Sequence, residues 1–463
     1  MNPVSPTLAL SDFAADLSYD SLPQNVRDLL FVCALDYLRV ASIGERMPWS
    51  AWTREYIKKT GASGTASLLY SSHQTDPASA AFQNTIYAGS IDADDTHVGA
   101  MLHPGSVVFS AALAMGQDRH LSGKQVLAAV AAGYEAMIRI ALCVQPGHFQ
   151  RGFQSTATCG VFGSATAASM LLFTQPDRPR RIAETLGLAA STSAGLVQFF
   201  HSGSTVKRLH AAQAARSGVQ SALLAESGFS GPTDILEGQD GFARAYSDHA
   251  DFSPLFDGLG TTYRLLEVAF KPHACSARVQ SAIEAAATLC RQHNLGPADI
   301  AAIILGIPSV IQGRLTGTEP DSLQAAQMSS PFSVALAIDK GRHSDAFSLS
   351  VDDFEAGLLN PAIKQLSARV QCVLDDEVER TSTGESVSAR VTLQLKDGQQ
   401  HSAFVRAPKG SLSRPFSVDD HIQRAENELA RRYPQAQIRQ LIQQLQEMPE
   451  MSDVATLAPL LGG

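Results

Sequence analysis

Residues 121–142, LSGKQVLAAVAAGYEAMIRIAL, decide the fold class, because apolar side chains recur in them at three- and four-residue spacing. That spacing gathers the apolar side chains on one side of an α-helix. Ser122 and Gln125 have the spacing of a capping box, in which the hydroxyl and the amide satisfy backbone N–H groups that lack helical partners. We therefore expect a long helix here, in a fold built mainly from helices.

A second stretch, residues 159–173 (CGVFGSATAASMLLF), combines apolar residues with small ones. The small residues, which stand at helical spacing, are Gly160, Gly163, Ala167 and Ala168. They would let two helix backbones approach, so we expect a buried helix packed against its neighbours. Helical periodicity runs from Ser21 to about Tyr246, which predicts a large helical domain.

The pattern changes after Phe270. Residues 300–311 are rich in isoleucine, and residues 388–395 and 401–407 alternate polar with apolar side chains on either side of Asp397-Gly398. An Asp-Gly pair supplies the positive φ angles of a tight two-residue turn, so this part predicts a β-hairpin. Helical patterns accompany the strands, at residues 275–293 and 331–340. The combination is typical of a compact α+β domain.

The chain then returns to a helical pattern. Ser417 and Asp420 have the spacing of another capping box, and helices rich in Arg, Glu and Gln continue to about Met448. We expect these helices to pack on the first domain. The predicted architecture is therefore mainly α, with an all-helical domain made of residues 1–268 and 409–463 and a smaller α+β lid domain inserted at residues 269–408.

Composition and charge exclude several classes of protein. The formal charge of −9 and the lack of a dense Lys/Arg run argue against nucleic acid as a partner. The first residues have no basic n-region and no continuous apolar stretch, so we expect neither a secretory signal nor a membrane anchor. The six cysteines stand singly, which disfavours a zinc site and a disulfide framework and fits a reducing cytoplasm.

The densest polar cluster is residues 91–108, IDADDTHVGAMLHPGSVV. Its polar side chains are those of Asp92, Asp94, Asp95, Thr96, His97 and His103. No helix face explains this mixture, and an adjacent carboxylate can orient a histidine ring and raise its basicity. We interpret the cluster as catalytic. The alternatives are an Asp-rich helix cap with exposed histidines and a metal site; we expect no metal, because no HxH or HExxH spacing is present.

Two cationic segments accompany the cluster. Lys207 follows a Gly/Ser-rich turn and opens an Ala-rich helix that we expect to end near Gly218, where free backbone N–H groups and an ammonium could hold an anion. Lys271 stands at the proposed domain boundary, with His273 and Arg278 close behind, and sites commonly form between domains. A solvated lysine and a hinge with incidental charge are the respective alternatives.

Together these segments resemble the MmgE/PrpD family, whose members include 2-methylcitrate dehydratase, cis-aconitate decarboxylase and iminodisuccinate epimerase. The resemblance covers nearly the whole chain. It rests on the Asp-x-Asp-Asp-Thr loop with His103-Pro104 and on the blocks GYEAMIRI, RGFQSTATCGVFGSATAAS, KRLHAAQAARSG, GFSGPTDILEGQDGF and FKPHAC. It implies a helical domain built from both chain ends, an inserted lid, a homodimer and no cofactor.

The resemblance also implies roles for single residues. Proton chemistry next to a carboxylate needs a base within reach and cations near the developing negative charge. His103 would transfer the proton, and Asp92 would orient it or act as an acid. Lys207 and Lys271 would bind substrate carboxylates from the two domains, and Thr96 would hydrogen-bond the substrate.

The chain departs from the family pattern at three places. Gln154 stands where many members carry histidine, Gln280 replaces a second family histidine, and Phe332 or Ser333 replaces a tyrosine. Glutamine cannot titrate, so the dehydratase and decarboxylase reactions of the family become less expected if that position supplies their acid or base. Histidines that could take over such a role are His97, His201 and His273.

We therefore expect a cytoplasmic, cofactor-independent lyase of the hydro-lyase type that acts on a small polycarboxylate related to citrate or methylcitrate. The residues expected to bind this substrate are Thr96, Gln154, His97, His273 and Arg278. The alternatives are a cofactor-free epimerase or isomerase, a decarboxylase of a dicarboxylate or tricarboxylate, a non-catalytic polycarboxylate-binding protein and a metal-dependent hydrolase.

Overall fold

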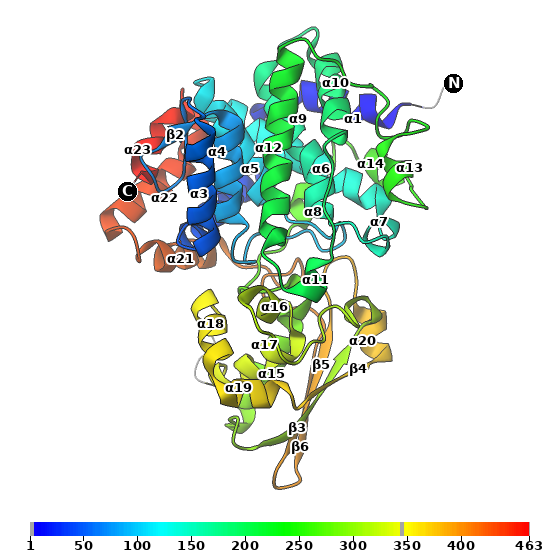
Figure 1. Cartoon of the computed structure of the whole chain (residues 1–463), viewed down its shortest axis with the longest axis vertical. Coiled ribbons are helices and arrows are strands. Elements are labelled where there is room, and N and C mark those ends of the chain that lie inside the picture. Colours follow the sequence, from blue (N-terminus) through cyan, green and yellow to red (C-terminus); the bar gives the residue numbers. More distant parts are fainter. Residues whose placement is uncertain (1–3, 343–346, 463) are drawn as a thin grey trace.

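Two hydrophobic cores divide the chain, which the computed structural model describes over residues 4–342 and 347–462. The first core runs from Leu10 to Ala274 and resumes with Val351 and with residues 425–461. The second runs from Cys275 to Leu395. Figure 1 shows the corresponding bodies, one above the other, with both chain ends in the upper one. The predicted fold class, mainly α with a smaller α+β part, is confirmed, whereas the exact boundaries stay a prediction.

The upper body is built from helices of both chain ends. Its helices are α1 (Pro6–Asp16), α2 (Gln24–Gly44), α3 (Pro48–Thr60), α4 (Pro77–Ala88), α5 (Pro104–Asp118), α6 (Gly123–Val144), α7 (Gly147–Gln150), α8 (Ser155–Thr158), α9 (Gly160–Leu172), α10 (Arg178–Ala190), α11 (Phe199–Ser202), α12 (Val206–Glu226), α13 (Phe242–Tyr246), α14 (Ser253–Phe256), α21 (Val418–Leu429), α22 (Gln435–Gln446) and α23 (Ala458–Leu461). Two short strands, β1 (Ala66–Ser67) and β2 (Gln74–Thr75), pair antiparallel beside them.

Helix α6 is the centre of this body. The predicted capping box at its start is confirmed, since Gln125 N donates to Ser122 Oγ and Ser122 N donates to Gln125 Oε1. Gly163 of α9 lies so close to α6 that an added Cβ would come within 2.9 Å of Met137 Cβ. Helix α6 is long and apolar enough to cross a membrane, yet 94% of its most apolar window is buried among the other helices. That burial is typical of the core helix of a globular domain.

Helix α12 continues past the end expected near Gly218 and runs to Glu226. Gly218 is a contact point inside the helix, because an added Cβ would lie 1.9 Å from Ser164 Oγ of α9. Ser164 Oγ also donates to the carbonyl of Ala214 at 2.8 Å, which joins the two helices. The glycine therefore serves close packing, and the interpretation as a helix end was wrong.

The lower body contains a four-stranded sheet in the order β4-β3-β5-β6. Its strands are β3 (Ile300–Ile307), β4 (Val370–Leu374), β5 (Ala389–Leu395) and β6 (Gln400–Val405). The predicted hairpin is confirmed: β5 and β6 pair antiparallel around Asp397-Gly398, and Gly398 has φ +90°. Strand β4, which the sequence analysis did not predict, pairs parallel to β3 at the edge of the sheet.

Helices complete the lower body. They are α15 (Gln280–His293), α16 (Leu323–Gln327), α17 (Ser330–Lys340), α18 (Val351–Leu359), α19 (Pro361–Ser367) and α20 (Asp376–Thr381). Helix α15 packs on β5 and β6, and α17 packs on α15. The chain then returns upward, and α21 and α22 pack on α2, as predicted (Figure 1). Ser417 and Asp420 form the predicted capping box.

The α9–α12 contact predicts a stability effect. Gly218→Ala should destabilise the fold by about 1–3 kcal/mol, because the added methyl group must displace Ser164. Gly317→Ala is the matched control, since a Cβ there meets no atom within 4 Å. Urea unfolding followed by circular dichroism measures both variants. Equal free energies of unfolding for the two variants would contradict this account of the packing.

Candidate active site

The polar loop between α4 and α5 lies where the two bodies meet. Thr96 N donates to Ala269 O at 2.9 Å, and Ala269 N donates to Thr96 O at 2.8 Å, so the loop is fastened to the strand-like segment that leads into the lower body. Asp92 has φ +55°, a left-handed conformation that aspartate tolerates better than most residues. The two backbone hydrogen bonds to Ala269 thus fix the middle of the loop.

The carboxylate of Asp92 is buried between two ammonium groups. Lys207 Nζ, from the first turn of α12, lies 2.6 Å from Asp92 Oδ2. Lys271 Nζ lies 2.7 Å from Asp92 Oδ1 and 3.3 Å from Asp94 Oδ1. The side chains of Asp92 and Lys271 are 5% and 2% exposed, so little solvent screens these pairs.

The ion pairs govern the protonation of the cluster. Burial alone would raise the pKa of Asp92, but Lys207 and Lys271 outweigh it and hold that pKa well below its usual range. Burial would lower the pKa of Lys271, but Asp92 and Asp94 raise it above its ordinary value. The pKa of Lys207 is lowered, chiefly by burial. Asp92 and Lys271 are therefore charged at neutral pH.

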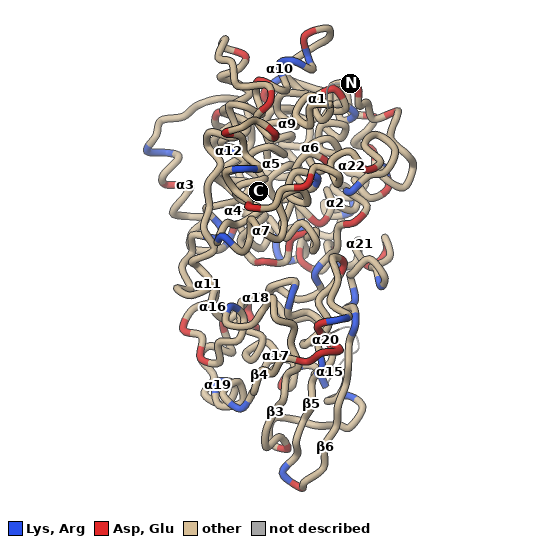
Figure 2. The backbone as a smooth tube through the Cα atoms, turned by 90° about the vertical axis from the view of Figure 1, so that its right-hand side faces the viewer, with Lys and Arg blue, Asp and Glu red and all other residues tan. Residues whose placement is uncertain are grey.

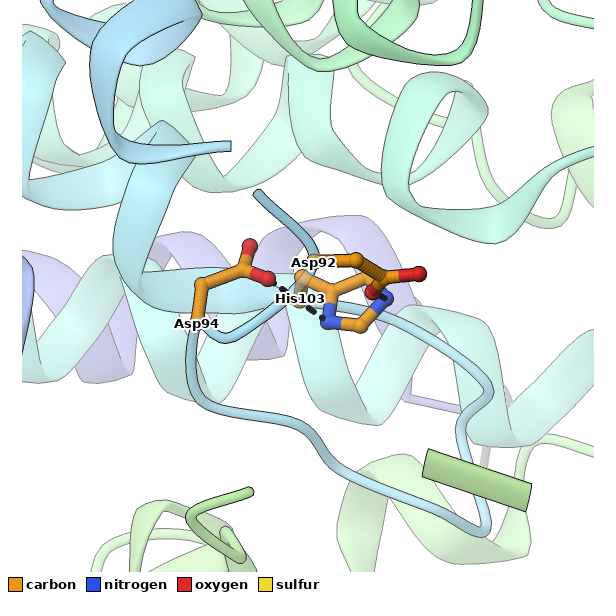
Figure 3. Close-up of side chains that lie close together, drawn as sticks. All are labelled: Asp92, Asp94 and His103. Carbon is orange, nitrogen blue, oxygen red and sulfur yellow. Dashed lines mark ion pairs between the residues drawn. The ribbon is translucent and has the colours of Figure 1, made fainter. Parts of the chain in front are cut away.

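His103 stands at the N-cap position of α5, and the hydrogen bonds at its Nδ1 assign the tautomer of the ring. Its Nδ1 lies 3.0 Å from the carbonyl oxygen of Asp95 and 2.9 Å from Thr96 Oγ1. A carbonyl oxygen only accepts hydrogen bonds, so this geometry places the hydrogen on Nδ1 and leaves the lone pair on Nε2. Nε2 lies 3.9 Å from Asp92 Oδ1, and Figure 3 shows the ring beside Asp92 and Asp94.

Burial lowers the pKa of His103 to about 4, with the two lysines contributing and the carboxylates of Asp94 and Asp92 opposing. The imidazole is therefore neutral at pH 7 in this structure. Neutral imidazole with a free Nε2 lone pair can accept a proton. A bound polyanion would raise this pKa, because negative charge near the ring favours its charged form.

Asp95 supports the loop from behind. Its Oδ1 accepts from Gly105 N at 2.9 Å, and its Oδ2 accepts from the Tyr134 hydroxyl at 2.7 Å. Burial raises the pKa of Asp95 to about 7, although the Tyr134 hydrogen bond opposes the rise. The sequence placed Asp95 in the cluster without a role. In the structure it fixes the start of α5, and with it the N-cap residue His103.

A cavity of about 610 Å³, including the space at its mouth, opens in front of His103. The polar side chains on its wall include those of Asp92, Thr96, His103, Gln154, Lys207 and Arg278. The apolar part of the wall includes Met101, Phe149, Val197, Phe199, Phe200 and Met328. The structure therefore brings the predicted residues of both bodies to one cavity, except for Lys271, His97 and His273.

Arg278 brings a cation from the lower body. Its guanidinium lies 4.8 Å from the Phe149 ring centroid, and the guanidinium of Arg314 lies 4.3 Å from the same centroid. Burial, with the nearby charge of Arg314, lowers the pKa of Arg278 to about 10, so it stays charged at neutral pH. Within the described residues, no carboxylate forms an ion pair with Arg278. It is thus a partly buried cation that faces the cavity and is available to an anion.

Gln154 is paired with a histidine that the sequence analysis missed. His210 Nδ1 lies 3.0 Å from Gln154 Oε1, so the ring donates to the amide oxygen and the amide NH₂ group remains for the cavity. His210 stands three residues after Lys207 on α12, and that spacing places both side chains on neighbouring positions of one helix face. The spacing was therefore a signal available in the sequence.

Two predicted substrate-binding residues lie elsewhere. His97 Nε2 lies 3.1 Å from Glu267 Oε2, and His97 Nδ1 accepts from Ala100 N, so this ring closes the loop instead of lining the cavity. His273 lies on the other side of the Lys271–Pro272 segment and lines a different cavity. Their expected contact with substrate has no support in the structure, because both side chains are used or directed elsewhere.

The remaining family departures are structural. The amide of Gln280 is buried and donates to the carbonyls of His273, Cys275 and Ser276. Phe332 and Ser333 are buried in the lower body. His201, a histidine considered as a replacement, is exposed on α11 and does not line the cavity. Gln280 therefore ties its own turn together and does not face the cavity in front of His103.

Asp92, Asp94 and His103 also offer ligand atoms within 4.8 Å of one another, as a metal site would. The ammonium groups of Lys207 and Lys271 already neutralise these carboxylates. A divalent cation would have to displace them or share the space with two positive charges, which opposes its binding. That no metal is used stays a prediction.

The chain is similar to known proteins over most of its length. The family description "MmgE/PrpD N-terminal domain" matches residues 8–255, and "MmgE/PrpD C-terminal domain" matches residues 273–448. A cis-aconitate decarboxylase of Aspergillus terreus is 26% identical over 430 residues, which cover 87% of this chain and 85% of that protein. The cis-aconitate decarboxylases of Mus musculus and Homo sapiens are 26% and 27% identical, over 83% and 74% of this chain and 79% and 71% of their own lengths.

The environment of His103 predicts its titration. The NMR signal that His103→Gln removes should show no protonation step between pH 5 and 8, because the pKa lies at about 4. Unfolded His103 takes up a proton near pH 6.5. Between these values the unfolded chain binds more protons, so this residue makes stability fall as the pH falls, and His103→Gln should flatten that slope. A midpoint near 6.5 in the free protein would refute the buried neutral ring.

Proposed function

Because the chain belongs to the MmgE/PrpD family, we propose that it is a lyase that removes CO₂ from a small polycarboxylate. The names of its relatives support this reaction class, since those proteins are cis-aconitate decarboxylases. The observation that carries the proposal is the cavity itself, in which one neutral imidazole and the guanidinium of Arg278 face the same space.

Substrate binding would use cations from both bodies. Arg278 would hold one carboxylate by paired hydrogen bonds, which are the strongest contacts that a guanidinium makes. The ammonium of Lys207 and the amide NH₂ of Gln154 would hold the others from the opposite wall. Lys271 does not line this cavity, so we assign it the task of keeping Asp92 ionised instead of the substrate contact expected from the sequence.

The chemical step then needs one proton. The bond between carbon and the departing carboxylate breaks, CO₂ leaves, and the electron pair stays on the carbon next to a second carboxylate. The Lys207 ammonium stabilises the charge that spreads into that carboxylate. His103, protonated once the substrate anions have raised its pKa, delivers the proton from Nε2 to carbon and regains one from solvent. Each turnover therefore consumes one proton and releases one CO₂.

The count of proton-transferring groups favours decarboxylation. Among the described residues on the cavity wall, His103 is the one histidine. Dehydration needs a base for the carbon-bound proton and an acid for the departing hydroxyl, whereas decarboxylation needs a single donor. The hydro-lyase reaction is the second candidate, because the lowered pKa of Lys207 would let that ammonium serve as the acid.

Cofactor independence belongs to the same proposal. Lysine and arginine side chains supply the positive charge that such a reaction requires, from within hydrogen-bond reach of the cavity. The six cysteines are free thiols, which suits the cytoplasmic location that we propose.

We also propose that the chain forms a homodimer. Trp52 and Tyr56 of α3 and Leu209 and Leu224 of α12 are exposed large apolar side chains, and the Arg216–Tyr56 hydrogen bond joins the two helices. Exposed apolar surface of this kind is typical of an interface. Sedimentation equilibrium measures the assembly, and a monomer at micromolar concentration would contradict the proposal.

The reaction class predicts a labelling result. Incubation with cis-aconitate, citrate or 2-methylcitrate in D₂O should release CO₂ from one of these acids or a close relative and place one deuterium at the new C–H bond. The measurement is gas release together with mass spectrometry of the product. Formation or loss of an alkene without CO₂ would select the hydro-lyase instead, and deuterium exchange with neither change would select an epimerase.

The residue roles predict different kinetic effects. His103→Ala should lower kcat by about 10²- to 10⁴-fold, since it removes the proton donor. Arg278→Gln should raise KM by about 10- to 100-fold, because a hydrogen bond to a charged group contributes roughly 1.5–3 kcal/mol. His201→Gln is the matched control, because His201 is exposed on α11 and does not line the cavity, and this variant should behave as the wild type. If the His103 and His201 variants had equal kcat, His103 would have no catalytic role.

A further inference from the structure

A second cavity opens between the two bodies, behind the segment Lys271–Pro272–His273. It encloses about 1640 Å³ including its mouth and shares no lining residue with the cavity in front of His103. Side chains of α15 and α21 form its walls. Figure 2 shows Lys and Arg gathered at this junction beside α21. The proposed reaction uses none of these groups.

The wall of this cavity is rich in positive charge. Its cations are Arg39, Arg291, Lys409, Arg414 and Arg424, and its carboxylates are Glu284, Asp420 and Glu428. The carboxylates are already engaged, with Arg414, Lys409 and Arg431 respectively. Arg39 is paired with Asp36. The acids of the wall therefore leave Arg424 without a carboxylate partner among the described residues.

The two terminal nitrogens of Arg424 differ in their hydrogen bonding. Its Nη2 donates to the carbonyl of Lys271 at 2.6 Å, and its guanidinium carbon lies 4.4 Å from the Phe416 ring centroid. Its Nη1 is buried and has no hydrogen-bond partner among the described residues. A buried donor without an acceptor is costly, and more so on a charged group, so this guanidinium beside the cavity lacks an acceptor that an anion could supply.

His273 offers a second donor to the same space. Its Nδ1 accepts a hydrogen bond from Leu349 N at 3.0 Å, which assigns the ring hydrogen to Nε2. The residue is 4% exposed and lines this cavity. No described residue accepts from Nε2. Burial, together with the charge of Arg424, lowers the pKa of His273 to about 3, so the ring is a neutral donor beside a cation.

We propose that this cavity is a second anion site, which binds a small oxyanion, a carboxylate or inorganic phosphate, through Arg424 and His273. Lys409, whose side chain is 44% exposed, adds a cation at the mouth. A carboxylate or phosphate oxygen would satisfy Nη1 and Nε2–H together, as a convergent set of polar groups in a cavity does for its ligand. The ligand would lie directly behind Lys271, whose carbonyl Arg424 already holds.

Calorimetric titration with inorganic phosphate and, separately, with succinate tests the site on the full chain. The Arg278→Gln variant removes a cation from the cavity in front of His103 and so weakens anion binding there. It should still bind one of these anions with a Kd within about threefold of the wild-type value. Arg424→Gln should weaken that binding at least tenfold. The tighter anion identifies the ligand class. Binding lost in Arg278→Gln and kept in Arg424→Gln would overturn the proposal, as would no binding of either anion by the wild type.

A second pair of variants serves if Arg424→Gln does not fold. Lys409→Met removes the charge at the mouth of the cavity, and Lys396→Met removes an equal charge from the exposed turn after β5. Lys409→Met should weaken anion binding several-fold, and Lys396→Met should leave it unchanged. Equal effects would show a response to net charge alone and would contradict a site. Because binding is the readout, failure here is distinct from failure of the proposed reaction.

Discussion

The buried carboxylate of Asp92, held between the ammonium groups of Lys207 and Lys271, is the interaction on which the rest of the structure depends. Removing one partner of such a buried ion group typically costs about 3–5 kcal/mol, because it leaves an uncompensated charge away from water. Lys207 belongs to α12 and Lys271 to the junction of the two bodies, so one carboxylate connects three segments that lie far apart in the sequence.

The same interaction sets the chemistry. The two ammonium groups balance the negative charge of the cluster before any substrate enters, and burial together with these lysines keeps His103 neutral. An incoming polyanion changes that balance and makes the ring more basic. The fold also brings cations from both bodies to the cavity. Arg278 comes from the lower body and Lys207 from the upper, so a polycarboxylate would be held by both.

Much of this could be predicted from the sequence, because the decisive signals are local. The capping boxes at Ser122 and Ser417 and the Asp397-Gly398 turn are fixed by a few adjacent residues, and each appears in the structure. The errors come from contacts between distant segments. Gly218 has the local character of a helix end, but its lack of a side chain serves the approach of α9.

The site shows the same division. The loop from Asp92 to His103 could be found because its polar residues are consecutive, whereas the direction of His273 could not, since spacing in an irregular segment does not set which way a side chain points. The second cavity was equally hidden, because α21 reaches Lys271 only in the folded chain.

A crystal structure with propane-1,2,3-tricarboxylate bound tests the central claim most directly. The account predicts carboxylates at Arg278 and Lys207, with a substrate carbon within hydrogen-bond reach of His103 Nε2. A ligand that binds without approaching His103, or that leaves Arg278 unpaired, would contradict it.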